Sequence, residues 1–334
     1  MKIKLLSCLF FLMISQLTSA QFGSGKLEDV QAVQKAPLLV VLQAKNDKVL
    51  KKITKKDGDE AAQKYLTNIE TTNASLKNGI TASWLYTSDI TFITEAELDK
   101  YDTKSNKNKY AILTAGRELG DNGYSMLQSK GLLTTYNYGI YLTGKRKRVY
   151  GMLTRSSQLT EGDIVFMSQQ IQNYLNARLD LKSGKMSRKE MTADLNENAA
   201  IIADKTLWIA EEDLKKDFVK KIKKMYPYQL KVTTKEAIDA EIINKKSDIC
   251  YLRIVPVGQQ TAGGGGPLKT SKLIYVQYVL DAEDGKILAY VTPSVGGSLL
   301  SGLGGALGNA LTKGNGQMGK GDMENVLKSV KKAK

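Results

Sequence analysis

The sequence contains no histidine, and this absence removes several kinds of active site. Ser-His-Asp and Cys-His nucleophilic triads need an imidazole base, and many zinc sites need imidazole ligands. The remaining designs are carboxylate pairs, Ser-Lys dyads and substrate-held metals, and the spacing of the acidic residues singles out none of them. We therefore expect a protein that is not an enzyme, with no catalytic residue, no metal site and no cofactor.

Cysteine is scarce, and no apolar run is long enough to span a membrane. Cys8 lies in an N-terminal segment with two lysines, an apolar stretch over residues 5–17 and small residues at 18–20. This pattern predicts a secretory signal peptide at 1–20, because its apolar run of about 13 residues is shorter than the ~20 that cross a bilayer. Its removal leaves Cys250 as the only thiol, which excludes an intramolecular disulfide and two-cysteine redox chemistry. Cys250 lies in an apolar strand, where we expect a buried, inert side chain.

Acidic side chains are in the minority: 34 Asp and Glu stand against 49 Lys and Arg, a formal net charge of +15. Such a charge favours anionic partners. Export makes nucleic acid the least favoured of them. We expect a periplasmic or extracellular location, with outer-membrane association left open. The partner would be another envelope protein, a second copy of the chain, or an anionic surface or glycan.

The chain does contain a pattern of helices and strands that recurs. Residues 226–256 predict a strand, a capped helix and a second strand, and residues 86–116 predict the same at a constant offset without a gap. Tyr226 then falls on Tyr86 and Leu252 on Ile112. Each half predicts the order β-α-β-α-β-β-β-α, with an extra helix in the first. We therefore expect an α/β (α+β) fold of two tandem repeats, each a mixed sheet with helices packed on it.

The domain boundaries follow from this repeat. Capping boxes are expected at Thr94 with Glu97 and at Thr233 with Glu236. After the signal peptide we expect an N-terminal lead at 21–36, a first α/β repeat at 37–180, a connector at 181–205, and a second repeat at 206–334 that carries a Gly-rich insert at 294–320.

Two lysine-rich helices, at 45–56 and 215–224, follow the first strand of each repeat, with six lysines in each. Amphipathic helices of this composition can bind a membrane surface. However, Val219 and Ile222 give only a narrow apolar face, and aromatic anchors are few. We therefore expect both to be core-packing helices with a solvated lysine face.

The turns of the two predicted hairpins carry opposite charges. A solvated turn is favoured for the basic one, although Arg side chains can also grip a phosphate or a carboxylate. Opposite signs at equivalent turns suggest that the two halves, or neighbouring molecules, dock turn to turn. The candidate interaction residues are Lys145, Arg146, Lys147 and Arg148 in the first turn, and Asp281, Glu283 and Asp284 in the second.

The segment 294–312 has no charged residue and is rich in glycine, with Gly304 and Gly308 in a GxxxG spacing. Such a spacing lets helices approach closely in membranes, but so much glycine disfavours a helix. A mobile loop is the first interpretation, an oligomerisation or partner-binding segment the second, and membrane insertion the third.

These observations predict an exported, non-enzymatic binding or assembly protein of the bacterial cell envelope, acting through its loops and its Gly-rich insert. One alternative is a His-free carbohydrate- or peptidoglycan-acting protein, which a cleft with two close carboxylates would favour. Another is a membrane-associated envelope component, which would fractionate with membranes.

Overall fold

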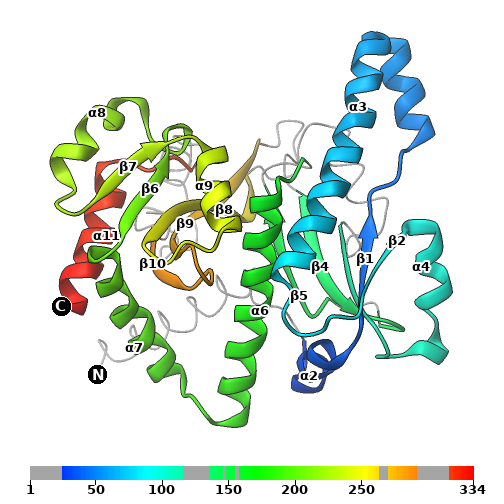
Figure 1. Ribbon diagram of the computed structural model, residues 1–334, viewed down its shortest axis with the longest axis horizontal. Helices are drawn as coiled ribbons and strands as arrows, with labels where there is room; N and C mark the ends of the chain where they lie inside the picture. Colours follow the sequence, from blue (N-terminus) through cyan, green and yellow to red (C-terminus); the bar gives the residue numbers. More distant parts are fainter. Residues whose placement is uncertain (1–24, 116–135, 146–147, 155–157, 263–269, 292–315) are drawn as a thin grey trace. The chain divides into compact units, whose positions relative to one another are not determined.

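The computed structural model describes residues 25–115, 136–145, 148–154, 158–262, 270–291 and 316–334. They form two compact units, an N-terminal unit at Ser24–Lys185 and a C-terminal unit at Met186–Glu241 and Lys245–Lys334 (Figure 1). Each unit contains one five-stranded mixed sheet with helices. The expected mixed α/β class is therefore confirmed.

The sheet of the N-terminal unit has the strand order β2-β1-β3-β4-β5. The strand β1 runs parallel to its two neighbours β2 and β3, and the pairs β3–β4 and β4–β5 are antiparallel. The elements are α2 (Leu27–Lys35), β1 (Leu38–Leu42), α3 (Asp47–Ser83), β2 (Ile90–Thr94), α4 (Glu95–Tyr101), η1 (Lys104–Asn106), β3 (Ala111–Ala115), β4 (Tyr136–Leu142), β5 (Tyr150–Thr154) and α6 (Glu161–Ser183).

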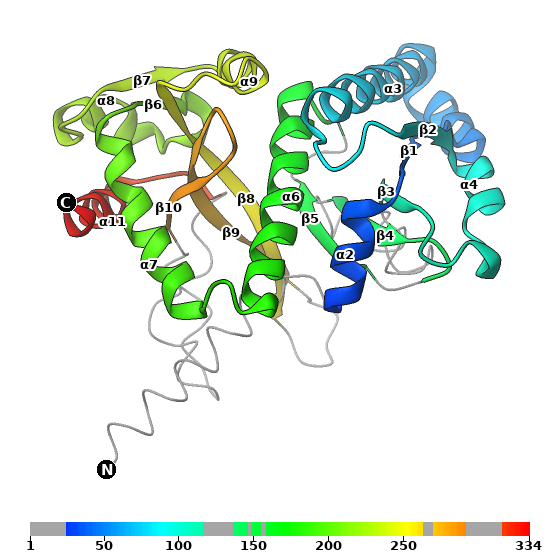
Figure 2. The ribbon, with the colours of Figure 1, turned by 60° about the horizontal axis from the view of Figure 1, so that its bottom comes forward.

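Helices cover both faces of this sheet, which explains why β1 is apolar at every position. Leu98 of α4 packs with one face, in a cluster with Leu39, Ile112 and Tyr141. Successive strand side chains point to opposite faces, so Leu113 belongs to the other face. That face carries α2, α3 and α6, and α6 contacts both of the other helices (Figure 2).

Capping residues set the starts of the short helices. Thr94 Oγ1 accepts a hydrogen bond from Glu97 N–H (3.3 Å), and Glu97 Oε2 accepts one from Thr94 N–H (2.8 Å), which confirms the first capping box. The second is wrong by one residue: α9 is capped by Thr234, whose hydroxyl accepts from Ala237 N–H at 3.3 Å. The helix starts at this threonine because Thr233 still belongs to the preceding strand.

The sheet of the C-terminal unit has the order β7-β6-β8-β9-β10, with β6 parallel to β7 and β8, and with antiparallel β8–β9 and β9–β10 pairs. The segment expected as a connector contains α7 and η3, which contact α11. The elements are α7 (Arg188–Asn198), η3 (Ala199–Ala203), β6 (Thr206–Ala210), η4 (Glu211–Asp213), α8 (Lys216–Met225), β7 (Leu230–Thr233), α9 (Lys235–Ile243), β8 (Ile249–Ala262), β9 (Thr270–Asp281), β10 (Ile287–Val291) and α11 (Lys320–Ala333).

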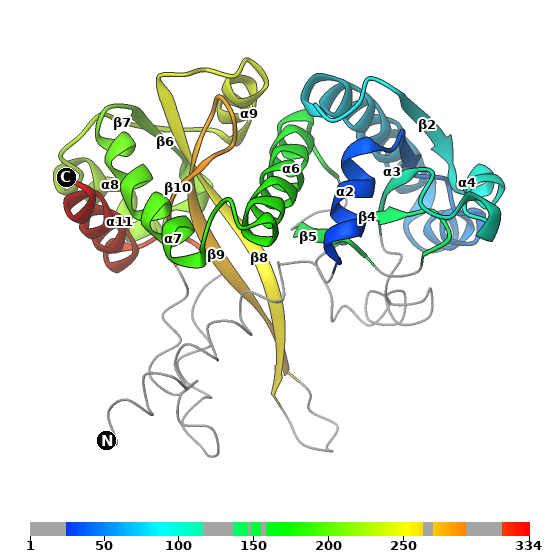
Figure 3. The same ribbon diagram turned by 90° about the horizontal axis from the view of Figure 1, so that it is seen from below.

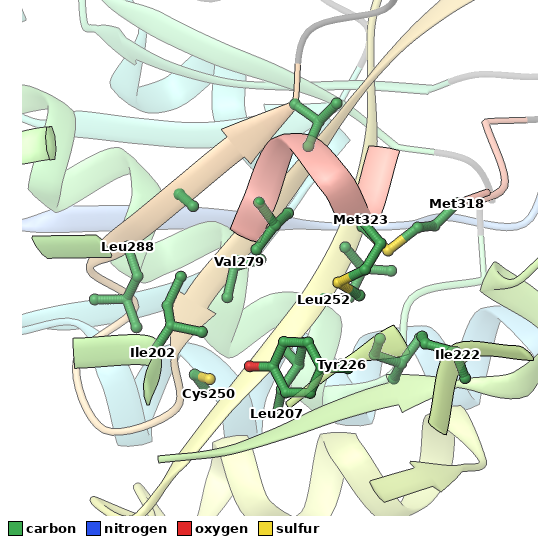
Figure 4. Close-up of a cluster of buried hydrophobic side chains, with 14 of the residues drawn as sticks. Ile202, Leu207, Ile222, Tyr226, Cys250, Leu252, Val279, Leu288, Met318 and Met323 are labelled. Carbon is green, nitrogen blue, oxygen red and sulfur yellow. The ribbon is translucent and has the colours of Figure 1, made fainter. Parts of the chain in front are cut away.

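The core of this unit lies between one face of the sheet and the helices α8 and α11 (Figure 4). Ile222 of α8, Met323 of α11 and Leu252 of β8 are all buried in it. Cys250 is buried in the same cluster and is not in a disulfide, as expected. Burial raises the pKa of its thiol to about 12, so the thiol stays protonated and inert.

The β8–β9 hairpin extends far beyond its neighbours. Its pairing runs from Cys250 with Asp281 to Ala262 with Thr270, whereas β6 pairs with β8 only as far as Tyr251. Figure 3 shows this long ribbon leaving the rest of the sheet.

Candidate interaction surface

The helix α3 consists of two legs, because Gly58 has a non-helical conformation (φ 87°, ψ 177°) in its middle. A side chain at this φ would be strained, so a glycine is needed there. In Figure 1 the first leg, which follows β1, turns back into the longer second leg at this point. We call residues 45–57 the lysine arm.

The arm starts with a well-formed helix cap. The Asn46 side chain accepts hydrogen bonds from the N–H groups of Lys48 and Val49, both at 3.1 Å. The Asn46 N–H donates to Tyr65 Oη of the second leg at 3.0 Å, which ties the base of the arm to that leg. Capping and this tie stabilise the arm as a helix.

Lysine side chains dominate the arm, and none of the residues at 47–57 is buried. Its apolar residues are only partly covered: Val49 is 40% exposed, and Leu50 and Ile53 are half-buried. Within the described chain, a carboxylate lies within ion-pair distance of only one arm lysine, Lys45, which contacts Asp47 at 3.4 Å. Five lysines share one helical face because they recur at spacings of three and four: Lys48, Lys51, Lys52, Lys55 and Lys56.

The other lysine-rich helix, α8, behaves differently although its sequence is similar. Residues 50–55 are LKKITK, and residues 219–224 are VKKIKK. Ile222 is fully buried with Phe218 in the core, while its counterpart Ile53 is not. The prediction of a core-packing helix is therefore confirmed for α8 and wrong for the arm. The arm differs because all buried residues of α3 lie in its second leg, where Gly79 packs closely against Ile164 of α6.

The basic hairpin turn is tied to its own unit at the described positions. Lys145 forms an ion pair with Asp29 of α2. Burial of Asp29 opposes its charge, but the hydrogen bonds from Lys145 and from the Lys26 N–H hold the pKa of its carboxyl below the usual range. Arg146 and Lys147 lie outside the described residues.

The Arg148 side chain packs over two glycines. Gly139 and Gly151 are partners in the β4–β5 ladder. A Cβ on Gly139 would lie 2.7 Å from Arg148 Cδ, and one on Gly151 would lie 2.5 Å from the same atom. Arg148 therefore fills the space that these two positions leave empty.

The acidic turn is also held within its own unit. Asp281 is buried, forms an ion pair with Lys205 and accepts a hydrogen bond from Glu283 N–H at 3.1 Å. Asp284 Oδ1 accepts from Lys286 N–H at 2.8 Å, and the Glu283 and Asp284 side chains are exposed. Lys145 and Asp281 thus already have partners of opposite charge, and turn-to-turn docking would depend on the other charges of the two turns.

Most of the Gly-rich insert, including Gly304 and Gly308, lies outside the described residues. The structure describes its end, residues 316–320. Met318 is buried and attaches to the segment before α8: its N–H donates to Asp213 O (2.8 Å), and its carbonyl accepts from Lys215 N–H (3.0 Å). Met318, near the end of the expected insert, therefore packs in the C-terminal core.

The two buried carboxylates among the described side chains are both in ion pairs. Asp239 of α9 contacts Arg253 Nη1 of β8 at 3.2 Å, and Asp281 contacts Lys205. Exposed glutamates have lowered pKa values at helix starts, as at Glu97, where hydrogen bonds from Thr94 stabilise the charged form. Burial raises the pKa of Tyr86 to about 12, and it also raises the pKa of Tyr226.

Among the side chains that the structure places, no three His, Cys, Asp or Glu residues come close enough to hold a metal ion. No helix in the described ranges has the length and apolar character needed to cross a membrane. No family model, curated protein or solved structure matches this chain.

Proposed function

We propose that the chain is an exported, non-enzymatic binding or assembly protein of the bacterial cell envelope. The observation that carries the proposal is the lysine arm, a preformed helix with exposed lysines whose apolar residues, unlike those of α8, are not buried in a core. A protein gains nothing in stability from such an exposed array of like charges, because the lysines repel one another. An anionic partner would remove that repulsion, so binding is a better account of the arm than folding.

We also propose that the two units derive from one tandem repeat. Their sheets have the same strand order and the same strand directions, which supports this origin. Matching the faces of the sheets corrects the gap-free alignment. Leu252 faces the core under α8 and α11, whereas Ile112 faces α4, so Leu252 corresponds to Leu113. A shift of one residue is needed because neighbouring strand residues point to opposite faces.

The proposed absence of an enzymatic role is supported by the contacts that individual carboxylates make within their own unit. Buried Asp239 and Asp281 pair with cations of their own unit, and the lowered pKa values of exposed Glu97 and Glu190 come from helix caps. Catalytic carboxylates usually converge on one cleft. Here a local structural contact explains each of these groups.

Export and binding are tested together by expressing the full chain in a bacterium with a photo-reactive amino acid in place of exposed Lys48 of the arm. The matched control carries it in place of exposed Lys331 of α11. We expect an adduct with an envelope component or a second copy from position 48 and not from 331. Deletion of residues 2–20 should leave the chain in the cytoplasm. Equal adducts at both positions, or unchanged location after the deletion, would contradict the proposal.

The non-enzymatic part is tested by incubating the purified chain with peptidoglycan fragments and soluble glycans. We expect no turnover. Turnover that disappears when an exposed carboxylate is replaced by its amide would establish the carbohydrate-acting alternative instead.

A further inference from the structure

We propose that the lysine arm docks onto the surface of an anionic lipid bilayer. This inference rests on the proposed function, since it names the partner class of an envelope binding protein. It concerns the N-terminal unit alone and involves residues 45–57 only.

The arm's charge has the arrangement that a flat anionic surface requires. Lys48, Lys51, Lys52, Lys55 and Lys56 recur on one side of a helix, and all five are exposed. A surface of anionic headgroups attracts such a row of lysines, and each lysine raises the affinity for that surface about fivefold. A protein partner would instead match these charges with a few carboxylates at fixed places.

The arm's apolar residues favour a lipid over other anions. Val49 lies beside the lysine face, three residues before Lys52 and seven before Lys56, and it is 40% exposed. An acidic polysaccharide or a nucleic acid would neutralise the lysines but would offer an aliphatic side chain little apolar surface. A bilayer interface offers both headgroup charge and acyl chains, as interfacial amphipathic helices require.

The arm is already helical without a membrane, which lowers the ordering cost of docking. Asn46 caps its first turn, and Thr54 Oγ1 donates to Leu50 O at 3.0 Å within the helix. Gly58 then ends the arm, and a Cβ there would meet no atom within 4 Å. The arm is therefore a short preformed helix, unlike a disordered basic tail that must fold as it binds.

The test is co-sedimentation of the full chain with phosphatidylcholine vesicles, with and without phosphatidylglycerol. The triple variant K51Q/K52Q/K55Q should bind the anionic vesicles about a hundredfold more weakly, because each of the three lost lysines contributes a factor of about five. The matched control is K220Q/K221Q/K224Q, which removes the same charge from exposed positions of α8 with the same spacing. Equal losses in both variants would show that net charge alone drives binding and would overturn the proposal.

The lipid assignment is tested separately with V49S, which keeps the charge of the arm. We expect binding to the anionic vesicles to fall about fivefold, because the side chain loses its contact with acyl chains. Binding to a soluble sulfated polysaccharide should not change. Stronger binding to the polysaccharide than to the vesicles, with no effect of V49S on either, would assign the arm to glycans and overturn the proposal.

The lipid inference and the proposed function can be refuted separately. If the purified chain does not bind vesicles but position 48 still gives a specific adduct in cells, the lipid inference alone is wrong. If vesicle binding depends on the arm but the chain stays in the cytoplasm of its host, the envelope assignment is wrong and the arm's preference for anionic lipid stands.

Discussion

The contrast between the two lysine-rich helices predicts unequal costs for the same substitution at equivalent positions. Ile222 is fully buried in the C-terminal core, so Ile222→Ala leaves a cavity and should lower the free energy of unfolding by about 3 kcal/mol. Ile53 is only half-buried. Ile53→Ala should cost about 1 kcal/mol or less, since part of the lost burial is offset by the higher helix propensity of alanine.

The chain provides its own probes for this comparison. It has two tryptophans, Trp84 in the N-terminal unit and Trp208 in the C-terminal unit, and both are buried. Replacing one of them with phenylalanine lets the fluorescence of the other follow a single unit during urea unfolding. For Ile222→Ala the unfolding midpoint followed by Trp208 fluorescence should fall by roughly 1 M urea. This shift is the expected loss of about 3 kcal/mol divided by a dependence of the unfolding free energy on urea of about 2–3 kcal/mol/M.

For Ile53→Ala the Trp84 midpoint should move by less than half of that. Equal shifts for the two variants would refute the conclusion that the arm lies outside the core. A larger shift for Ile53→Ala would refute it more strongly. Circular dichroism of both variants checks that neither change melts its helix.

Three further predictions concern the two cores. In the chain from Gln21 onward, Cys250 should not react with a thiol reagent until the protein unfolds. The free energy of unfolding, measured with urea, should fall between pH 9 and 12, because the thiol ionises in that range in the unfolded chain but not in the folded one. Gly79→Ala should cost about 1–3 kcal/mol in thermal unfolding, because a Cβ would lie 2.7 Å from Ile164 Cβ across the α3–α6 contact. Arg253→Leu should cost about 3 kcal/mol by removing the cation from buried Asp239, and adding Asp239→Leu should recover part of the loss; no recovery would contradict the pairing.

The sequence was sufficient to predict the strands, because their apolar runs and turns are local signals. The strands and helices expected within 86–116 and 226–256, and the capping box at Thr94, all appear close to the expected residues. Mixed sheets followed from the combination of hairpins with β-α-β crossovers. These features depend on residues that are neighbours in the chain.

The candidate site depends on packing, and the sequence could not predict it. The arm and α8 have almost the same lysine and isoleucine pattern, yet only α8 reaches a core. Periodicity tells which side of a helix is apolar, but it does not tell whether another element covers that side. The same limit applies to Lys145 and Asp281, whose partners Asp29 and Lys205 lie far away in the sequence.

The strand order described for both sheets has a consequence for how the chain folds. In each unit the strand that is made first, β1 or β6, lies between strands that are made later. Its second parallel neighbour follows only after two helices, so pairing must wait for distant segments, and folding should be slow for domains of this size. Yet neither sheet takes a strand from the other half of the chain. Each unit can therefore complete its own sheet without waiting for the other, so that the chain folds unit by unit.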